Sequence, residues 1–423
     1  MITAIVGANW GDEGKGRMVD LLSQDYEIVM RYQGGNNAGH TVINDKGKFI
    51  LNLLPSGILR EEVVNVMGGG MVIDIKHLTG ELNNLRKAGI VITPNNLKIS
   101  STATICMPYN VMQDILEEER LKDKKFGSTR RGIAPIYADK YMKKTIRMGD
   151  LFNLATLEEK VAGIVEWKNL TIEKGYGSKP FTTKEIMEYL TTFGLPLLPY
   201  ICNVTEFLSK AIDDKKDIMM EAQLGALRDI DFGIYPYTSS SSTIASYAPI
   251  GAGIPFAKIE KSIAIVKAYS SCVGEGPFTV EMFGQEAEDL RKAGGEYGAA
   301  TGRPRRVGAF DVVATKYGVK MQGGTEVALT KLDVMSYMKK IPICVAYDVN
   351  GTRTDVFPTG DDLVVAKPII EYMDGFETDI SGCKKFKQLP IQAQNYIKYV
   401  EKAIGCRISY VSVGADRDAF IKM

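Results

Sequence analysis

Residues 2–17 read Ile-Thr-Ala-Ile-Val-Gly-Ala-Asn-Trp-Gly-Asp-Glu-Gly-Lys-Gly-Arg, an apolar run that passes directly into a glycine-rich turn. A strand that leads into such a turn and then into a helix points backbone N–H groups and a helix N-terminus at phosphates. We therefore interpret residues 7–17 as a phosphate-binding loop. If residues 7–17 bind phosphate, other segments of the chain should supply contacts to the rest of a nucleotide.

The loop departs from the usual pattern G-x-x-x-x-G-K-[ST] at two positions. Asn9 stands where the first glycine is expected, and Gly16 stands where the serine or threonine is expected. Because that hydroxyl normally binds Mg²⁺, the metal needs another ligand here. The loop also carries two carboxylates, Asp12 and Glu13, beside the expected phosphates. Metal ligation and general-base work are the tasks that suit them.

Short apolar, β-branched runs recur along the chain and alternate with helical patterns such as Thr79–Ala88. This alternation predicts an α/β fold with a P-loop NTPase-like central, mostly parallel β-sheet flanked by helices, whose ligands collect at the carboxyl ends of the strands. Residues 105–215 are richer in helix formers and predict an inserted helical subdomain within a single catalytic domain, 1–423. The expected strands are Ile2–Val6, Tyr26–Arg31, Val63–Met67, Lys98–Ser100, Ile218–Glu221, Ile263–Ala268, Glu326–Thr330, Ile343–Tyr347 and Ile408–Val413.

The composition of the 423 residues, with 45% hydrophobic and 24% charged, is that of an ordinary globular protein. The net charge of +1 argues against nucleic-acid and membrane partners. Six scattered cysteines without a C-x-x-C pair are typical of reduced thiols. Since Met1–Ala4 runs straight into a strand and no apolar stretch has the length of a membrane span, we expect a soluble, cytoplasmic protein.

The segment Arg31–Thr41 follows an expected strand and contains His40, one of only two histidines. Its glycines and asparagines allow backbone and amides to approach a ligand closely. His40 is then a candidate general acid or a donor to a developing oxyanion. A glycine-rich turn with an incidental histidine is the alternative, but the N-terminal loop favours the functional interpretation. The other histidine, His77, has no such setting and is expected to be structural.

A Lys-x-Asp sequence, Lys331-Leu332-Asp333, comes after another expected strand. An aspartate there can accept hydrogen bonds from N1–H and N2–H₂ of guanine while the lysine stem covers the ring. A helix-start cap is the alternative, and it is the more common one for an isolated tripeptide. The phosphate loop reverses that preference. Residues 412–414 (Ser-Val-Gly), at the end of the last expected strand, would close the base pocket from the other side.

Two further loops are suited to anions. Residues 298–306 hold Arg303, Arg305 and Arg306 around a glycine and a proline, an arrangement suited to bidentate recognition of carboxylate or phosphate. Residues 127–132, with Thr129, and the serine tract 239–242 carry hydroxyls suited to a phosphate monoester. Solvated charge and a flexible spacer are the alternatives.

Taken in order and spacing, these motifs resemble one family closely across essentially the whole chain, the adenylosuccinate synthetases, which join IMP and L-aspartate using GTP. The matching segments are residues 10–16 (Trp-Gly-Asp-Glu-Gly-Lys-Gly), 33–41 (Gln-Gly-Gly-Asn-Asn-Ala-Gly-His-Thr), 54–57 (Leu-Pro-Ser-Gly), 301–306 (Thr-Gly-Arg-Pro-Arg-Arg) and 330–333 (Thr-Lys-Leu-Asp).

The resemblance implies that Asp12 takes the N1 proton of IMP and binds Mg²⁺ together with the Gly39 carbonyl. It implies that His40 is the acid that helps GTP phosphorylate O6, and that aspartate displaces the resulting phosphate. The implied GTP contacts are Gly11, Asp12, Glu13, Gly14, Lys15, Gly16, Arg17, Gly39, His40, Thr41, Arg305, Lys331, Leu332, Asp333, Ser412, Val413 and Gly414. The implied IMP contacts are Asp12, Glu13, Gly14, Lys15, Asn37, Ala38, Gly39, His40, Thr129, Lys143, Gln223, Leu224, Ser239 and Arg303. Aspartate would bind Ala299, Ala300, Thr301, Gly302, Arg303, Pro304 and Arg305.

Three positions depart from the commonest family pattern. The family usually reads Glu-Gly-Ala-Gln-Gly where this chain has Glu-Ala-Gln-Leu-Gly at 221–225. Direct alignment puts Leu224 at the purine-contacting glutamine. Leucine cannot hydrogen-bond O6, so we expect a one-residue shift that lets Gln223 serve. Lys143 replaces an arginine that reaches the IMP of the partner subunit in a homodimer, which keeps the charge and loses bidentate geometry. Ser239 replaces threonine.

Other functions compatible with these motifs are a viral-type synthetase that condenses aspartate with dGMP, a GTP-binding regulatory protein or GTPase switch, and a catalytically dead scaffold. The viral-type group lacks the loop aspartate retained here as Asp12. A switch would not need His40 or the arginine loop. Intact Asp12 and His40 argue against a scaffold.

Overall fold

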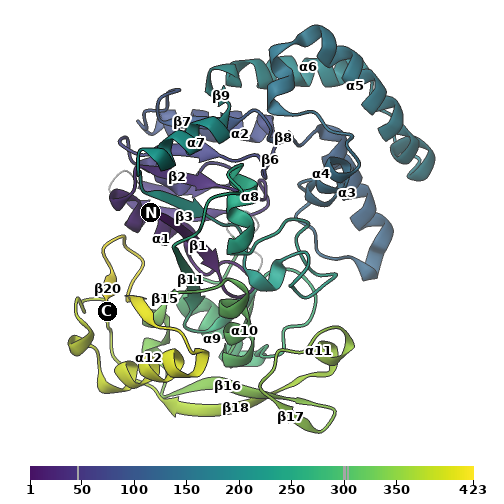
Figure 1. Ribbon diagram of the computed structural model, residues 1–423. Coiled ribbons are helices and arrows are strands. Elements are labelled where there is room, and N and C mark those ends of the chain that lie inside the picture. The colour runs from purple at the N-terminus through teal and green to yellow at the C-terminus, as the bar shows by residue number, and fades with distance from the viewer. Residues whose placement is uncertain (45–46, 299–301, 303) are drawn as a thin grey trace.

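The computed structural model describes residues 1–44, 47–298, 302 and 304–423. Within this part of the chain, ten strands form one central sheet (Figure 1). Every neighbouring pair runs parallel except β19 and β20, which confirms the predicted α/β class with a mostly parallel sheet. In spatial order the strands are β20 (Phe420–Lys422), β19 (Ile408–Ser412), β15 (Glu326–Thr330), β11 (Lys261–Lys267), β1 (Ile2–Gly7), β10 (Ile218–Glu221), β2 (Ile28–Arg31), β5 (Val64–Met67), β7 (Leu97–Ser100) and β9 (Ile201–Cys202).

Strand β1 lies inside the sheet between β10 and β11, and all six of its residues are buried. A parallel strand covered on both faces is largely apolar, which explains why Thr3 is the one polar side chain in this run. The register pairs Ile5 with Glu221, Glu221 with Arg31, and Lys267 with Thr330. These strand ends therefore lie along one edge of the sheet, the edge at which ligands of open α/β sheets bind.

Helices cover both faces of the sheet (Figure 1). Helix α1 follows the phosphate loop and buries Met18, Val19 and Leu22, so the loop is anchored by apolar packing at its helical end. The helices outside the 105–215 segment are α1 (Lys15–Leu22), α2 (Ile75–Lys87), α8 (Ala248–Ala252), α9 (Gly284–Gly294), α10 (Val312–Met321), α11 (Asp361–Val365) and α12 (Ile391–Ile404).

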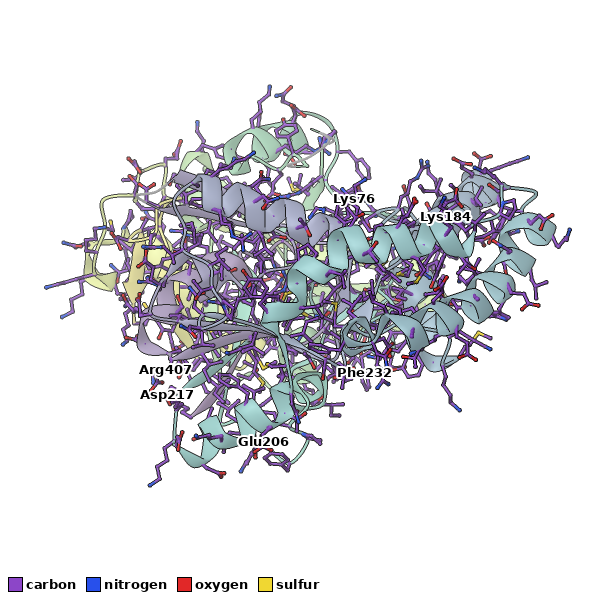
Figure 2. All side chains as sticks on the ribbon, turned by 90° about the horizontal axis from the view of Figure 1, so that it is seen from above. Lys76, Lys184, Glu206, Asp217, Phe232 and Arg407 are labelled. Atoms are coloured by element: carbon purple, nitrogen blue, oxygen red, sulfur yellow. The ribbon has the colours of Figure 1, made fainter. Side chains whose placement is uncertain are left out.

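Residues 105–215 are largely helical. Figure 2 shows Lys184 of α6 on an arm of helices that projects away from the side of the molecule where Arg407 and Asp217 lie. The segment rejoins the sheet at β9, which pairs with β7, and α7 then packs near that edge. Its helices are α3 (Pro108–Leu121), α4 (Ile133–Tyr141), α5 (Leu154–Asn169), α6 (Thr183–Gly194) and α7 (Val204–Asp213).

Two features go beyond the expected strand pattern. The run at 343–347 is a strand, but it belongs to a separate sheet of β14 (Phe310–Asp311), β16 (Lys340–Val349), β17 (Thr352–Thr354) and β18 (Lys367–Asp374). The expected strand is confirmed, and its place in this second sheet depends on long-range pairing that a local run of residues does not specify. The second feature is a hairpin of β3 (His40–Asn44) and β4 (Gly47–Leu51). Shorter pairs are β6 (Val72–Ile73) with β8 (Thr104–Ile105) and β12 (Ser270–Cys272) with β13 (Arg306–Gly308).

Within the described parts of the chain, no helix is both long enough and apolar enough to cross a lipid bilayer.

Candidate functional site

The loop between β1 and α1 has a cradle-like backbone. Gly11, Asp12 and Gly14 have positive φ angles of 98°, 59° and 98°. Glycine adopts such angles at little cost, and aspartate is one of the few other residue types that tolerate them. A backbone of this kind turns successive N–H groups toward the concave side of the loop, which suits it to anions.

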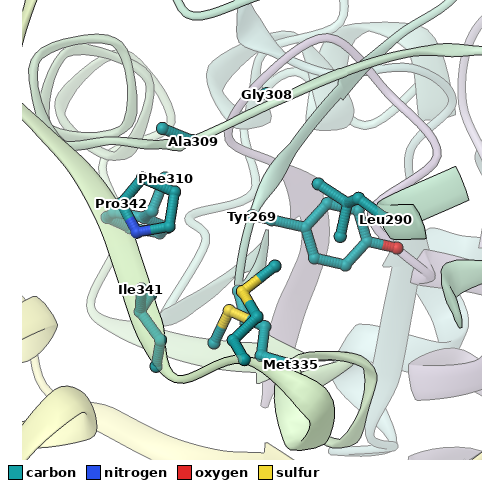
Figure 3. A pocket seen from close by; sticks show the side chains of 10 residues that line it. Tyr269, Leu290, Gly308, Ala309, Phe310, Met335, Ile341 and Pro342 are labelled. Atoms are coloured by element: carbon teal, nitrogen blue, oxygen red, sulfur yellow. The ribbon is translucent and has the colours of Figure 1, made fainter. Parts of the chain in front are cut away.

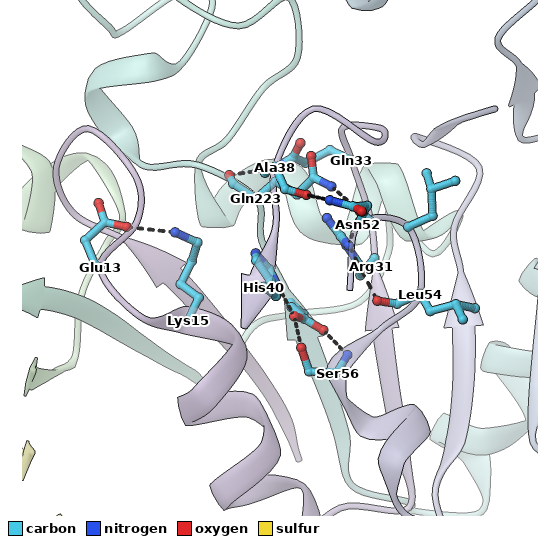
Figure 4. Close-up of polar contacts among 12 residues, drawn as sticks. Glu13, Lys15, Arg31, Gln33, Ala38, His40, Asn52, Leu54, Ser56 and Gln223 are labelled. Atoms are coloured by element: carbon cyan, nitrogen blue, oxygen red, sulfur yellow. Dashed lines mark hydrogen bonds and ion pairs between the residues drawn. The ribbon is translucent and has the colours of Figure 1, made fainter. Parts of the chain in front are cut away.

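Glu13 fills the interior of this loop. Its Oε1 accepts hydrogen bonds from the N–H groups of Asn9 at 3.0 Å and Gly11 at 2.9 Å. Its Oε2 lies 2.7 Å from Nζ of Lys15 (Figure 4), and both side chains of this ion pair are 2% exposed. The side chain of Asp12 is 33% exposed. Of the two loop carboxylates, Asp12 is therefore the one that can meet a ligand.

Gly16, in the first turn of α1, allows close approach of His40. A Cβ atom at Gly16 would lie 2.5 Å from Cβ of His40 and 3.1 Å from Oγ of Ser56. Any side chain there would push the imidazole away from the phosphate loop. The glycine that replaces the expected hydroxyl thus has a steric purpose, which is to bring the histidine next to the loop.

His40 belongs to a buried network with Glu221 and Ser56 (Figure 4). Its Nδ1 is in hydrogen-bond contact with Oε1 of Glu221, which also accepts from Oγ of Ser56 at 2.6 Å. The Ser56 N–H donates to the other carboxylate oxygen at 2.7 Å. Sequence inspection did not identify this network, although Glu221 ends a strand at the ligand-binding edge and Ser56 lies in a family motif.

Burial lowers the pKa of His40, and the attraction of Glu221 opposes that shift. Burial acts to raise the pKa of Glu221, but His40 and Arg31 outweigh it, so this pKa lies below its ordinary value. Glu221 is therefore ionised and accepts the Nδ1 hydrogen bond. The other ring nitrogen of His40, Nε2, has no partner among the described atoms and is the nitrogen available for chemistry.

Gln223 and Leu224 have different surroundings. Gln223 is fully buried, and its Nε2 donates to the carbonyls of Gly35 at 2.5 Å and Asn52 at 3.1 Å (Figure 4). Its Oε1 has no partner among the described atoms. Leu224 is partly exposed, has a φ of 59° and lies against Gly11 of the phosphate loop. The amide nitrogen of Gln223 is thus committed to the chain itself, and only the oxygen is free for a ligand.

The Lys331–Asp333 segment adjoins the phosphate loop. Thr330, at the end of β15, donates through Oγ1 to the carbonyl of Glu13 at 2.6 Å. Lys331 then turns the chain with a φ of 58°, and Leu332 is buried. Oδ1 of Asp333 is buried and unpartnered among the described atoms, and burial raises the pKa of this carboxyl. A buried acceptor without a partner is costly unless a ligand donates to it.

Arg17 connects α1 to the turn at 412–414. Its Nη1 donates to Oγ of Ser412 at 2.8 Å, and its guanidinium lies 4.3 Å from the ring centroid of Phe420. Ser412 in turn donates to the carbonyl of Gly414 at 3.2 Å, and Val413 is buried. The segments predicted to bind guanine are therefore brought together beside the loop predicted to bind phosphate.

The arginine loop meets the exposed carboxylate of the phosphate loop. Nη2 of Arg305 lies 3.4 Å from Oδ2 of Asp12. Arg306 points elsewhere, because its guanidinium pairs with Glu281 at 2.6 Å. Gly302 and Pro304 are described, whereas four other residues predicted for aspartate or IMP lie outside the described residues: Ala299, Ala300, Thr301 and Arg303.

The two loops predicted to hold a phosphate monoester lie near each other. Thr129 is exposed in the loop that follows Phe126, and the ring of Phe126 packs 6.2 Å from that of Tyr237, close to Ser239. An open hollow lies beside this aromatic contact, near the residues that precede each of the two loops. It is lined by Asp123, Lys124, Lys125, Tyr237, Glu275 and Gly276.

Asn37, Ala38 and Gly39 lie in the segment that precedes β3, and Thr41 lies within β3. The side chain of Asn37 accepts from the N–H of Gly35 at 3.2 Å, and the carbonyl of Ala38 accepts from Nδ2 of Asn52 at 2.9 Å. Gly39 and Thr41 are exposed.

Lys143 follows helix α4 in a turn. It is exposed and has a φ of 62°. The two residues before it, Tyr141 and Met142, are 76% and 55% exposed. This turn therefore places apolar side chains and a cation together on the surface of the protein.

Among the described residues, no group of three or more His, Cys, Asp or Glu side chains is arranged to hold a metal ion. Mg²⁺ does not require such a group, because it commonly binds one or two carboxylates together with substrate phosphates and water. The exposed carboxylate of Asp12, beside a loop that suits phosphates, fits that mode of binding.

Comparisons with known proteins agree over the whole chain. The family model of adenylosuccinate synthetase matches residues 4–421. Adenylosuccinate synthetase 2 of Pseudoalteromonas translucida is 44% identical over 419 residues, which covers 99% of this chain and 98% of that protein. Adenylosuccinate synthetase of Bifidobacterium adolescentis is 42% identical over 420 residues, with coverage of 99% and 98%.

Solved structures give the same result. The fully ligated adenylosuccinate synthetase of Plasmodium falciparum matches with a TM-score of 0.93 and 33% identity, over 100% of this chain and 99% of that chain. The succinoaminodeoxyadenylate synthetase of cyanophage S-2L, solved with dGMP and dATP, matches with a TM-score of 0.60 over 100% of this chain and 95% of that chain. At 17% identity, the second likeness shows the fold alone. This chain belongs to the adenylosuccinate synthetase family.

Proposed function

We propose that the protein is a GTP-dependent ligase that joins IMP and L-aspartate into adenylosuccinate, releasing GDP and phosphate. The observation that carries this proposal is the meeting of three segments at one edge of the sheet. Gly16 of the phosphate loop contacts His40, and Asp12 of the same loop contacts Arg305. A base, an acid and an anion-binding arginine thereby surround one phosphate loop, which suits a reaction that uses all three.

The proposed chemistry proceeds in two steps. Asp12 takes the N1 proton of IMP, which moves electron density onto O6, and O6 attacks the γ-phosphorus of GTP as the bond to GDP breaks. His40 donates from Nε2 while charge develops on the oxygens. The aspartate amine then attacks C6, the C6–O6 bond breaks, and phosphate leaves with the former O6 while the new C6–N group gives up one proton to the departing phosphate. This order converts a poor leaving oxygen into a good one.

For ligand binding, we propose that Lys15 and the surrounding loop hold phosphates of GTP, and that Lys331, Asp333 and residues 412–414 hold guanine. Mg²⁺, bound by the Asp12 carboxylate and the Gly39 carbonyl with phosphate oxygens, would neutralise charge during phosphoryl transfer. Thr129 and Ser239 would bind the IMP phosphate, and residues 299–305 would bind aspartate.

Gln223 is the residue proposed to contact the purine. Its amide nitrogen donates to two carbonyls, whereas its Oε1 has no partner among the described atoms, so in this arrangement the side chain can accept a hydrogen bond from IMP but cannot donate the expected one to O6.

We also propose that the protein is a single catalytic unit that works as a cytoplasmic homodimer, in which Lys143 reaches the IMP site of the partner. The exposed Tyr141 and Met142 beside Lys143 support this, because an interface would cover these side chains. All six cysteines are free thiols, as suits a reducing compartment.

The direct test follows loss of GTP and appearance of adenylosuccinate while IMP, aspartate or GTP is omitted in turn. We expect product only with all three substrates. GTP hydrolysis that needs neither IMP nor aspartate would favour a GTPase switch instead. Faster turnover of dGMP than of IMP would favour the viral-type reaction.

Asp333→Asn is expected to raise KM for GTP by roughly 10- to 100-fold, because a hydrogen bond to a charged acceptor contributes about 1.5–3 kcal/mol. KM values for IMP and aspartate should stay near those of the parent protein. Xanthosine triphosphate should become a better substrate, because an asparagine N–H can donate to the 2-oxo group of xanthine. An unchanged preference among nucleoside triphosphates would contradict the guanine pocket assigned to Asp333.

Glu221→Gln is expected to lower kcat and to move the alkaline limb of its pH profile to lower pH. An acid must be protonated to work, so activity falls as pH rises through the pKa of His40. Glu221 raises that pKa, and its neutralisation should lower it. Glu81→Gln is a suitable control, since Glu81 is buried near Arg31 and, among the described residues, its carboxylate accepts hydrogen bonds from the backbone N–H groups of 52–54. Equal pH profiles for parent and Glu221→Gln would exclude the proposed support of His40.

A further inference from the structure

One buried carboxylate, that of Glu296, collects four donors from separate parts of the chain. Its side chain is completely buried. Oε1 accepts from Nζ of Lys267 and Nζ of Lys331, each at 2.9 Å, and from the hydroxyl of Tyr269. Oε2 accepts from Nη1 of Arg305 at 2.8 Å. Two of these four donors, Lys331 and Arg305, belong to motifs with proposed roles in ligand binding.

The backbone reinforces both of these contacts. The N–H of Arg305 donates to the carbonyl of Glu296 at 2.9 Å, and Nζ of Lys331 also donates to the carbonyl of Gly294 at 2.6 Å. Lys267 ends β11 and pairs in register with Thr330 at the end of β15. The cluster thus joins two central strands to the arginine loop.

Tyr269 holds the other side of the carboxylate in place. Its ring lines a small pocket with Leu290 and Met335 (Figure 3). The lining of this narrow pocket is largely apolar. This apolar packing fixes the ring, and its hydroxyl consequently stays directed at Glu296.

The charges of the cluster do not balance internally. Lys267, Lys331 and Arg305 contribute three positive charges against the single negative charge of Glu296. Without the carboxylate, three cations would face one another in a largely buried space, and repulsion would drive the two less buried side chains apart. The side chains of Lys331 and Arg305 are 33% and 19% exposed and can move toward solvent. The side chain of Lys267 is only 4% exposed, so it would stay in place.

Arg305 links this cluster to Asp12, the residue proposed as the base. Its second terminal nitrogen, Nη2, lies 3.4 Å from Oδ2 of Asp12. One guanidinium therefore bridges the buried carboxylate of Glu296 and the carboxylate proposed as the base. A chain of contacts runs from Lys331 through Glu296 and Arg305 to Asp12.

We propose that Glu296 is a positioning residue that holds the guanine-binding lysine and the arginine beside the base in one fixed arrangement. The inference rests on the proposed function, because it takes Lys331 to bind GTP and Arg305 to bind an anionic substrate group. Glu296 itself touches no substrate. Its removal should therefore affect two substrates together and spare the third.

The test is steady-state kinetics of Glu296→Gln with each substrate varied. We expect KM for GTP and KM for aspartate each to rise by about tenfold or more, with KM for IMP within about twofold of the parent value. Glu286→Gln is the control: Glu286 also lies on α9 but is exposed, so this variant should keep the kinetic constants of the parent protein. A rise in KM for all three substrates, or for none, would overturn the proposal.

A double-mutant cycle with Lys331→Met separates positioning from stability. If Glu296 acts through Lys331, its replacement should raise KM for GTP less in the Lys331→Met background than in the parent, while its effect on KM for aspartate persists. Equal effects in both backgrounds would contradict the proposal, as would a lower Tm without any change in KM. The parent protein is assayed first with each substrate omitted. If it makes no adenylosuccinate, the proposed function fails, and an active parent with an unaffected variant refutes only the role of Glu296.

Discussion

Asp12→Asn is expected to lower kcat for adenylosuccinate formation by about 10²- to 10⁴-fold, because an amide cannot accept the N1 proton of IMP. The substitution is mild for the backbone. Asp12 has a φ of 59°, and asparagine tolerates this left-handed conformation as well as aspartate does. The loop should therefore keep its shape, so that the loss reports the carboxylate.

Two measurements check this result. Titration calorimetry should show that the variant binds GTP in the absence of magnesium nearly as the parent does, since Lys15 and the N–H groups remain. Asp214→Asn makes the same chemical change at an exposed position on α7's end and should leave kcat unaltered. Near-normal turnover of Asp12→Asn would refute the assignment of the base.

His40→Asn is expected to reduce kcat by a similar factor, about 10²- to 10⁴-fold, because no proton donor would remain at the position of Nε2. The loss should fall on phosphoryl transfer. It can be measured as scrambling of ¹⁸O between the bridging and non-bridging positions of GTP when IMP is present and aspartate is absent. The parent should scramble the label, and the variant should scramble it far more slowly.

The other histidine supplies the matched control for this variant. His77 contacts Oδ1 of Asn52 through Nε2 at 3.0 Å and lies on α2, so His77→Asn should keep most of the activity. If the His40→Asn variant had a low kcat but scrambled the label at the parent rate, His40 would act in a step after phosphoryl transfer.

The fold was predictable where local pattern and burial agree. The run at 2–6 and the centre of the run at 326–330, residues 327–329, are mostly apolar because their strands are covered on both faces, and both strands are found where expected. The hairpin that begins at His40 was not predicted as a strand. Residues 40–43 and 48–51 alternate between buried and exposed, but the glycines and asparagines before the hairpin are the stronger local signal.

Only residues within compact motifs of the sequence could be proposed for the candidate site. Asp12, His40, Lys331 and Arg305 all lie in such motifs, and each has a neighbour in the structure that fits an assigned role. Long-range partners have no local signature. Glu221 lies 181 positions from His40 along the chain, and only the order of strands in the sheet brings the two together.

Glu13 shows a second limit of local reasoning. A carboxylate in a phosphate loop suggests a ligand for metal or a base, and residue type alone cannot say which way it points. Here the side chain turns inward and is satisfied by the loop's own donors.

The inward carboxylate of Glu13 determines how strongly the loop can bind a phosphate. The two N–H groups and the ammonium that would hold an incoming anion already hold Glu13. An arriving phosphate therefore competes with an internal surrogate anion rather than with water. Exchange of one for the other yields little free energy by itself, so a free inorganic anion gains little from the loop. A nucleotide also binds through its base and its sugar, and the free energy of those contacts can offset the displacement of Glu13. The loop therefore favours whole nucleotides over free phosphate.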